Sequence, residues 1–143
     1  MIGFEYDDGG RAEAGYKGSA GDCGVRALAI AAEIPYQEAY DVCNKFAKAE
    51  RVKAGAPRSS ARNGMFIDTY RKAAALFGFR WVPTMSFGSG CEVHLRADEL
   101  PAGRIIARVS KHLVAIVDGT VHDTADPSRY GTRCVYGYFI RED

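Results

Sequence analysis

The chain has 143 residues, of which 47% are hydrophobic and 26% are charged, and its formal net charge is +1. This length suits a single domain over residues 1–143 with a core of its own. A net charge so close to zero excludes a general attraction to nucleic acid or to an anionic membrane. No apolar run approaches the length that spans a bilayer.

The N-terminal part of the chain predicts a short strand and then a buried helix. The strand covers residues 2–7, and a Gly-rich irregular segment follows it. The helix runs from Cys23 to about Ile34, and only Arg26 and Glu33 interrupt its apolar character. A helix that is apolar nearly all round packs in the interior of a protein.

Two further helices complete the helical part of the chain. Pro35 suits the first turn of the second helix, which runs to about Glu50. The third helix follows Asn63 as a cap and ends at Gly78. In the second helix Cys43 falls on the apolar stripe, so we expect it in the core.

After Gly78 the apolar pattern changes to that of β-strands. We expect strands over residues 79–84, 104–110, 112–117, 120–124 and 135–141. Helices followed by antiparallel strands predict an α+β fold, with N-terminal helices packed on a C-terminal antiparallel sheet. The buried helix that begins at Cys23 is then expected to meet this sheet.

Cys23 is the candidate nucleophile. It lies in Gly21-Asp22-Cys23-Gly24, a turn that leads directly into the apolar helix. A thiol at a helix N-terminus faces unpaired N–H groups and the positive end of the helix dipole, and both favour the thiolate. We expect Asp22 to be the N-cap and to accept from the first turn. The alternative is a small buried core cysteine.

His112 is the candidate partner of this thiol. It precedes the apolar run Leu113–Val117, and the following Asp118-Gly119 predicts a hairpin. A cysteine, a distant histidine and an acid that orients the histidine form the arrangement for catalysis by a thiolate. His122, on the second strand, is expected to point to the opposite face and to be dispensable.

The register of this hairpin decides which carboxylate lies beside His112. A two-residue turn at Asp118-Gly119 places Asp123 diagonally beside the imidazole. A three-residue turn shifts the pairing by one residue and places Asp126 opposite it. Turn statistics favour the shorter turn and therefore Asp123.

Three motifs resemble those of papain-like cysteine peptidases: Asp22-Cys23-Gly24 before Ala27-Leu28-Ala29, His112 before an apolar strand, and Asp126-Pro127. The similarity is to compact bacterial members, such as the bacteriocin-leader-processing peptidase domains of ABC exporters, and to small phage and prophage proteins. The resemblance implies a papain-like fold and a triad of Cys23, His112 and Asp126, with Asp123 as support or substitute. The Gln that this family places before the cysteine is absent, so Lys17 and Ser19 become the candidate oxyanion donors.

The resemblance implies a cysteine hydrolase, or thiol protease, that cleaves a peptide or isopeptide bond in a protein or peptide substrate without a cofactor. A transferase that passes the acyl group to an amine is one alternative. A non-enzymatic phage or virion interaction protein that retains the fold is another. Residues 1–8 contain acids and no basic segment, so we expect no signal peptide, and a location in the bacterial cytoplasm or on the virion.

The remaining motifs predict no other site. Without a secretion signal, we expect no disulfide framework among the four cysteines. Cys91 and His94 have the spacing of half a zinc site, but no second pair of ligands has that spacing, so we expect no metal. Residues 51–62 carry four basic residues and no acid, which is typical of a solvated loop. The loop lacks interleaved aromatics, so we expect no nucleic-acid partner.

Overall fold

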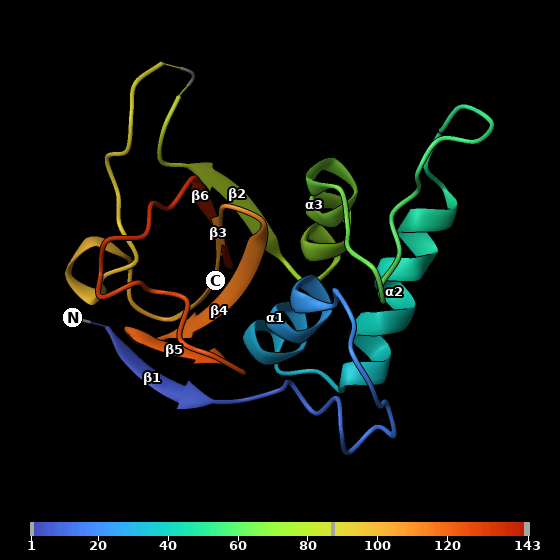
Figure 1. Cartoon of the computed structure of the whole chain (residues 1–143), viewed down its shortest axis with the longest axis horizontal. Helices are drawn as coiled ribbons and strands as arrows, with labels where there is room; N and C mark the ends of the chain where they lie inside the picture. The colour runs from blue at the N-terminus through green and yellow to red at the C-terminus, as the bar shows by residue number, and fades with distance from the viewer. Residues whose placement is uncertain (1, 87, 142–143) are drawn as a thin grey trace.

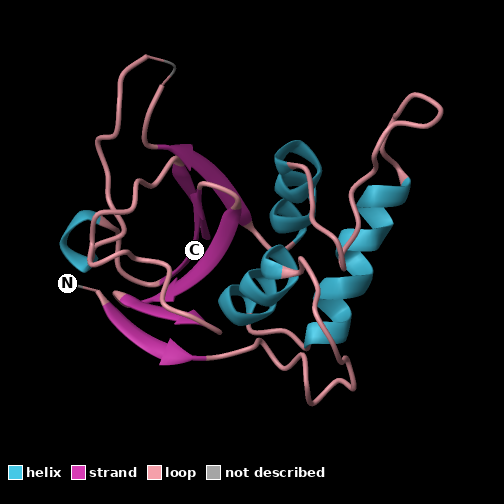
Figure 2. Cartoon of the chain, in the orientation of Figure 1, coloured by secondary structure: helices cyan, strands magenta, loops and turns pink. Residues whose placement is uncertain are grey.

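The computed structural model describes residues 2–86 and 88–141. Within these residues, three α-helices pack on one side of a mixed six-stranded sheet, which is an α+β arrangement (Figures 1 and 2). The helices are α1 (Cys23–Ala32), α2 (Tyr36–Lys48) and α3 (Ile67–Leu76), with a short 3-10 helix, η1 (Ala97–Glu99). The strands are β1 (Gly3–Tyr6), β2 (Phe79–Pro83), β3 (Arg104–Val109), β4 (His112–Val117), β5 (Thr120–Asp123) and β6 (Gly137–Arg141).

The strand order in the sheet is β1-β5-β4-β3-β6-β2. All neighbours from β5 to β2 pair antiparallel, as predicted for the C-terminal strands. The prediction of a wholly antiparallel sheet is corrected at one edge, where β1 pairs parallel with β5 and Phe4 lies opposite Val121. The sequence pattern identifies β1 as a strand, but its partner lies more than a hundred residues away, so local periodicity carries no information about its direction.

Helix α1 lies between the sheet and α2, at the centre of the helical side (Figure 1). Eight of its ten residues are buried, and the two exceptions are Cys23 and Arg26. The helix ends where Glu33 adopts the left-handed conformation, with φ of 57°, and its N–H donates to the Ile30 carbonyl. Burial on nearly every side fixes the position of the Cys23 end relative to β4.

A second apolar cluster lies on the other face of the sheet. Strand residues such as Ile116 and Val121 form it together with Leu95 and Val135, which come from the long connections before β3 and β6. These connections lie on the side of the sheet away from the helices (Figure 1). None of the described helices is long and apolar enough to cross a membrane.

The two connections are joined by a disulfide between Cys91 and Cys134, with Cα atoms 5.8 Å apart. The expectation of no disulfide is therefore wrong. The two cysteines are 43 positions apart in sequence, and a backbone bridge between His94 and Cys134 brings their segments together. Only the tertiary structure creates this proximity. Cys43 is free and fully buried, as predicted.

We expect reduction of the Cys91–Cys134 disulfide to lower the melting temperature. In the chain-entropy model, a bridge between residues 43 positions apart contributes on the order of 4 kcal/mol to stability. Circular dichroism melts of the oxidised and reduced wild type should differ accordingly. The double variant Cys91→Ser/Cys134→Ser should melt like the reduced protein and should not respond to reductant. Identical melts of the oxidised and reduced wild type would contradict a stabilising role.

Candidate active site

Cys23 opens α1 and lines a cavity of about 310 Å³ between the helix start and the end of β3 and start of β4. The thiol is half-buried. Gly24 is needed beside it, because a Cβ there would lie 2.9 Å from the ring of Tyr70. The Tyr70 hydroxyl donates to the Gly24 carbonyl over 2.7 Å and fastens the first turn of α1 to α3. The Cys23 thiol, the candidate nucleophile, therefore lies on a rigid helix end with one side open to the cavity.

His112 lies across this cavity at the first position of β4. Its Nε2 is 2.6 Å from Oδ2 of Asp123. A hydrogen-bonding interaction of the imidazole with the Cys23 thiol shifts the pKa of both groups. The backbone N–H of Leu113 is a further donor to the sulfur. Three residues that are distant in sequence thus form a continuous chain from carboxylate to imidazole to thiol.

The hairpin register places Asp123 beside His112. Val117 pairs with Thr120 and Ile116 with Val121, so the turn is the two-residue turn at Asp118-Gly119. Asp126 is exposed, and its Oδ1 accepts from the backbone N–H of Ser128 over 2.9 Å. The preference for Asp126 is therefore corrected: it stabilises the turn after β5, and the carboxylate on the imidazole is Asp123.

The environment favours an ion pair between Cys23 and His112. Burial raises the pKa of the Cys23 thiol, but the hydrogen bond and the positive charge of His112 outweigh burial and lower this pKa below its usual value. Burial lowers the pKa of His112, whereas Asp123 and the Cys23 sulfur raise it to about 9 overall. Both pKa shifts favour a thiolate next to an imidazolium, which is the reactive form of a nucleophilic cysteine.

Arg26 connects this site to the interior. Its Nη1 is 2.9 Å from Oδ1 of Asp123, and its Nε is 3.2 Å from Oδ1 of the buried Asp22. Both oxygens of Asp123 are therefore occupied, one by Arg26 and the Thr124 backbone N–H and the other by His112. This arrangement prevents the carboxylate from rotating away from the imidazole. The positive charge of Arg26 also lowers the pKa of Cys23.

Asp22 occupies the N-cap position of α1, as predicted, but it makes no side-chain cap hydrogen bond, so the predicted contact with the first turn is wrong. Its carboxylate is buried and accepts from the Tyr36 hydroxyl over 2.6 Å. It also pairs with Arg11 at 3.1 Å. Its contacts with Tyr36, Arg11 and Arg26 hold the irregular segment before α1 in place. The N–H groups of the first turn of α1 therefore have no side-chain partner from Asp22.

The two predicted oxyanion donors lie outside the cavity beside Cys23. Lys17 and Ser19 are both exposed, and neither lines the cavity. Their backbone carbonyls accept from Arg11 and Arg62, respectively. Sequence reasoning missed three polar side chains that do line it: Asn63, Arg108 and Lys111. Lys111 directly precedes His112, which is the one signal in the sequence that pointed to it.

The other histidines belong to different environments. Nδ1 of His122 is 3.1 Å from Asp7 and 3.3 Å from Glu5. His94 pairs with Glu99 beside the disulfide. In the part of the chain that the structure describes, no three His, Cys, Asp or Glu side chains are grouped as metal ligands.

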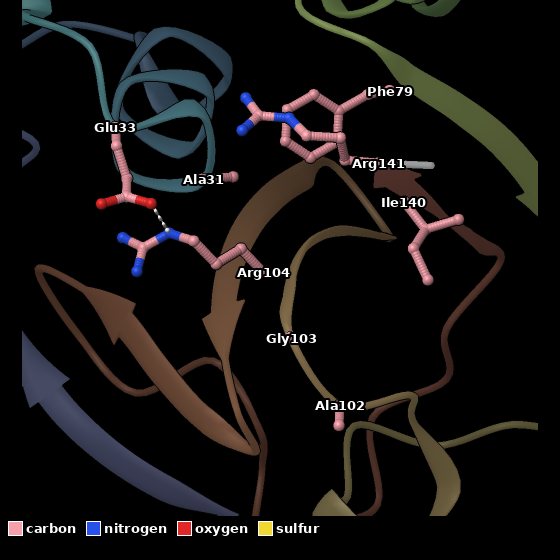
Figure 3. A pocket seen from close by; sticks show the side chains of 8 residues that line it. All are labelled: Ala31, Glu33, Phe79, Ala102, Gly103, Arg104, Ile140 and Arg141. Atoms are coloured by element: carbon pink, nitrogen blue, oxygen red, sulfur yellow. Dashed lines mark ion pairs between the residues drawn. The ribbon is translucent and has the colours of Figure 1, made fainter. Parts of the chain in front are cut away.

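A second cavity, of about 390 Å³, lies at the other end of α1 (Figure 3). Arg104 and Arg141 extend along it, and the Arg104 Nε is 3.4 Å from Glu33. Arg104 also donates to the Ile30 carbonyl at 2.8 Å, and the Arg141 guanidinium lies 4.7 Å from the ring centre of Phe79. The residues that line it include no cysteine or histidine. These contacts fasten the C-terminal end of α1 to the sheet and give the cavity a structural role.

Comparison of the chain with protein-family models, with curated proteins and with solved structures finds no match. The geometry of Cys23, His112 and Asp123 is therefore the basis for inferring a function.

Proposed function

We propose that this protein is a papain-like cysteine hydrolase that cleaves a peptide or isopeptide bond. The observation that carries the proposal is the chain of contacts from Asp123 through the His112 imidazole to the half-buried thiol of Cys23. A histidine with a purely structural role does not need to lie beside a cysteine whose pKa is lowered at a helix start. The cavity beside the thiol leaves room for a substrate.

In the proposed reaction the Cys23 thiolate attacks the scissile carbonyl carbon, and the carbonyl π electrons move to the oxygen. The unpaired N–H groups at the start of α1 stabilise this oxyanion. Collapse breaks the C–N bond, and the His112 imidazolium gives its proton to the leaving amine. Water then attacks the thioester while His112 accepts a proton, and the C–S bond breaks to restore the thiolate. No cofactor takes part.

A transferase uses the same first half of this reaction and differs only in the acceptor, which is an amine in place of water. No observation in the cavity favours a bound amine, so hydrolysis is the proposal. The non-enzymatic alternative does not account for the position of Arg26, which fixes one Asp123 oxygen while the other contacts His112. The Cys91–Cys134 disulfide favours a virion-associated or other oxidising location over the reducing cytoplasm.

The test is the pH dependence of Cys23 alkylation by iodoacetamide, mapped by mass spectrometry. With the pKa of Cys23 lowered by His112, the wild-type rate should rise less steeply between pH 6 and pH 9 than the rate of an ordinary thiol. In His112→Ala the thiol returns to an ordinary pKa of about 8.5 or above, so its rate at pH 6 should be about a hundredfold or more below that at pH 9.

Internal controls come from the other cysteines. Cys43 should not be alkylated, because burial raises its pKa to about 12, and Cys91 and Cys134 are joined to each other. A wild-type Cys23 with the steep pH profile of an ordinary thiol would overturn the proposed function.

A further inference from the structure

The cavity beside Cys23 has basic side chains in its lining and no acidic ones. Its lining includes Arg108 and Lys111 and no aspartate or glutamate. Four other cavities in the described part of the chain each contain at least one carboxylate. With a net charge of only +1 for the whole chain, the positive charge here is a local feature that the average composition does not explain.

The two basic side chains are held at the cavity by the ends of β3 and β4. Arg108 pairs with Leu113 across the strands, and its guanidinium lies 5.9 Å from the ring centre of Tyr136. Lys111 is exposed in the turn just before His112, in a left-handed conformation with φ of 56°. Arg133 donates to the Ser110 carbonyl and fixes this turn. None of the ion pairs of the described residues engages Arg108 or Lys111.

The opposite wall of the cavity adds no acidic side chain. Asn63 and Gly64 line it, and the segment that leads to them, residues 51–62, has four basic residues and no acid. Arg62 donates to the Ser19 carbonyl over 3.3 Å, which holds the end of this segment close to the chain before Cys23. The carboxylates near the nucleophile, Asp22 and Asp123, are buried and already paired with arginine. An incoming substrate therefore meets the positive charge of Arg108 and Lys111, which no carboxylate in the cavity lining neutralises.

We propose that this cavity selects peptide substrates with an aspartate or glutamate side chain close to the scissile bond, held by Arg108 and Lys111. The inference rests on the proposed function and adds its substrate class. A carboxylate in the cavity gains charge-assisted hydrogen bonds from Arg108, and one at its rim gains attraction from Lys111. A substrate lysine in the same place would be repelled by the positive charges of Arg108 and Lys111.

The test uses peptidyl chloromethyl ketones, in which the Cys23 thiolate forms a C–S bond and chloride leaves. Acetylated tripeptide probes that differ only by Glu, Gln or Lys at each position in turn are compared by their second-order rate of Cys23 modification. At one of the three residue positions, the probe with Glu should modify Cys23 about tenfold faster than the probe with Gln, and the probe with Lys should be the slowest. Raising the salt from 50 to 500 mM should reduce this preference.

Matched variants identify the residues responsible. Arg108→Gln and Lys111→Gln should each reduce the Glu preference about three- to tenfold, and Arg108→Lys should retain part of it. Arg71→Gln and Lys72→Gln remove the same charges from exposed positions on α3 beside another cavity and should leave the preference unchanged.

The outcomes separate the two proposals. Fast modification of Cys23 with no charge preference, or a preference that survives both cavity variants, would overturn acidic selectivity and leave the hydrolase proposal standing. Modification no faster than in His112→Ala would overturn the hydrolase proposal itself. Stronger protection of Cys23 by a thymidine oligonucleotide than by an oligoglutamate peptide would assign the basic wall formed by Arg108 and Lys111 to nucleic acid and would also overturn the inference.

Discussion

Cys23→Ser should abolish hydrolysis of an internally quenched peptide pool while the protein keeps its fold. A serine hydroxyl in this position stays protonated, because one imidazole beside it does not lower its pKa enough to yield an alkoxide. We expect turnover to fall by about 10⁴-fold or more, as for the loss of the nucleophile in a catalytic unit. Because Cys23 is half-buried and the change is one atom, the circular dichroism spectrum and melting temperature should be close to those of wild type.

His112→Ala should cause a loss of similar size, and the double variant should be no worse than either single variant, because the two groups act as one unit. His122→Ala is the matched control. It removes an imidazole that contacts Glu5 and Asp7 and should leave turnover unchanged. Wild-type turnover in Cys23→Ser would exclude thiolate catalysis, and loss of activity in His122→Ala but not in His112→Ala would reject the site.

Asp123→Asn should lower the alkaline limit of activity, which is the pH above which turnover declines. The carboxylate of Asp123 is a main contributor to the raised pKa of His112, which is about 9. Activity in the wild type should therefore decline as pH rises through about 9, where the imidazolium loses the proton it gives to the leaving amine. With an amide in place of the carboxylate, the pKa of His112 falls toward the ordinary value of about 6.5. The decline should begin at correspondingly lower pH, and the maximal rate should fall about tenfold or more.

Asp126→Asn is the control for this prediction, since it makes the same chemical change three residues away. Asp126 accepts from the Ser128 backbone and has no contact with His112. Its substitution should leave both the maximal rate and the alkaline limit as they are. If Asp126→Asn shifts the limit and Asp123→Asn does not, the proposed role of Asp123 is wrong.

Local patterns in the sequence determined most of the secondary structure. The apolar helix starting at Cys23, the hairpin at Asp118-Gly119 and the burial of Cys43 follow from short-range periodicity and turn chemistry, and all three are confirmed. These features depend on residues within a few positions of one another. The same patterns placed Cys23 at a helix start and His112 at a strand start, which are the positions that the cavity brings together.

The tertiary structure decided which groups complete the site and what surrounds it. Asp123, not Asp126, lies beside His112 because a shift of one residue in a hairpin exchanges the faces of a strand. Arg26 reaches across 97 positions to Asp123, and the Cys91–Cys134 disulfide spans 43. The lining of the cavity combines Arg108 and Lys111 with the uncharged Asn63 from a separate connection. Contacts between such distant segments leave no periodic trace in the sequence, because they depend on how helix and sheet pack rather than on the neighbours of any one residue.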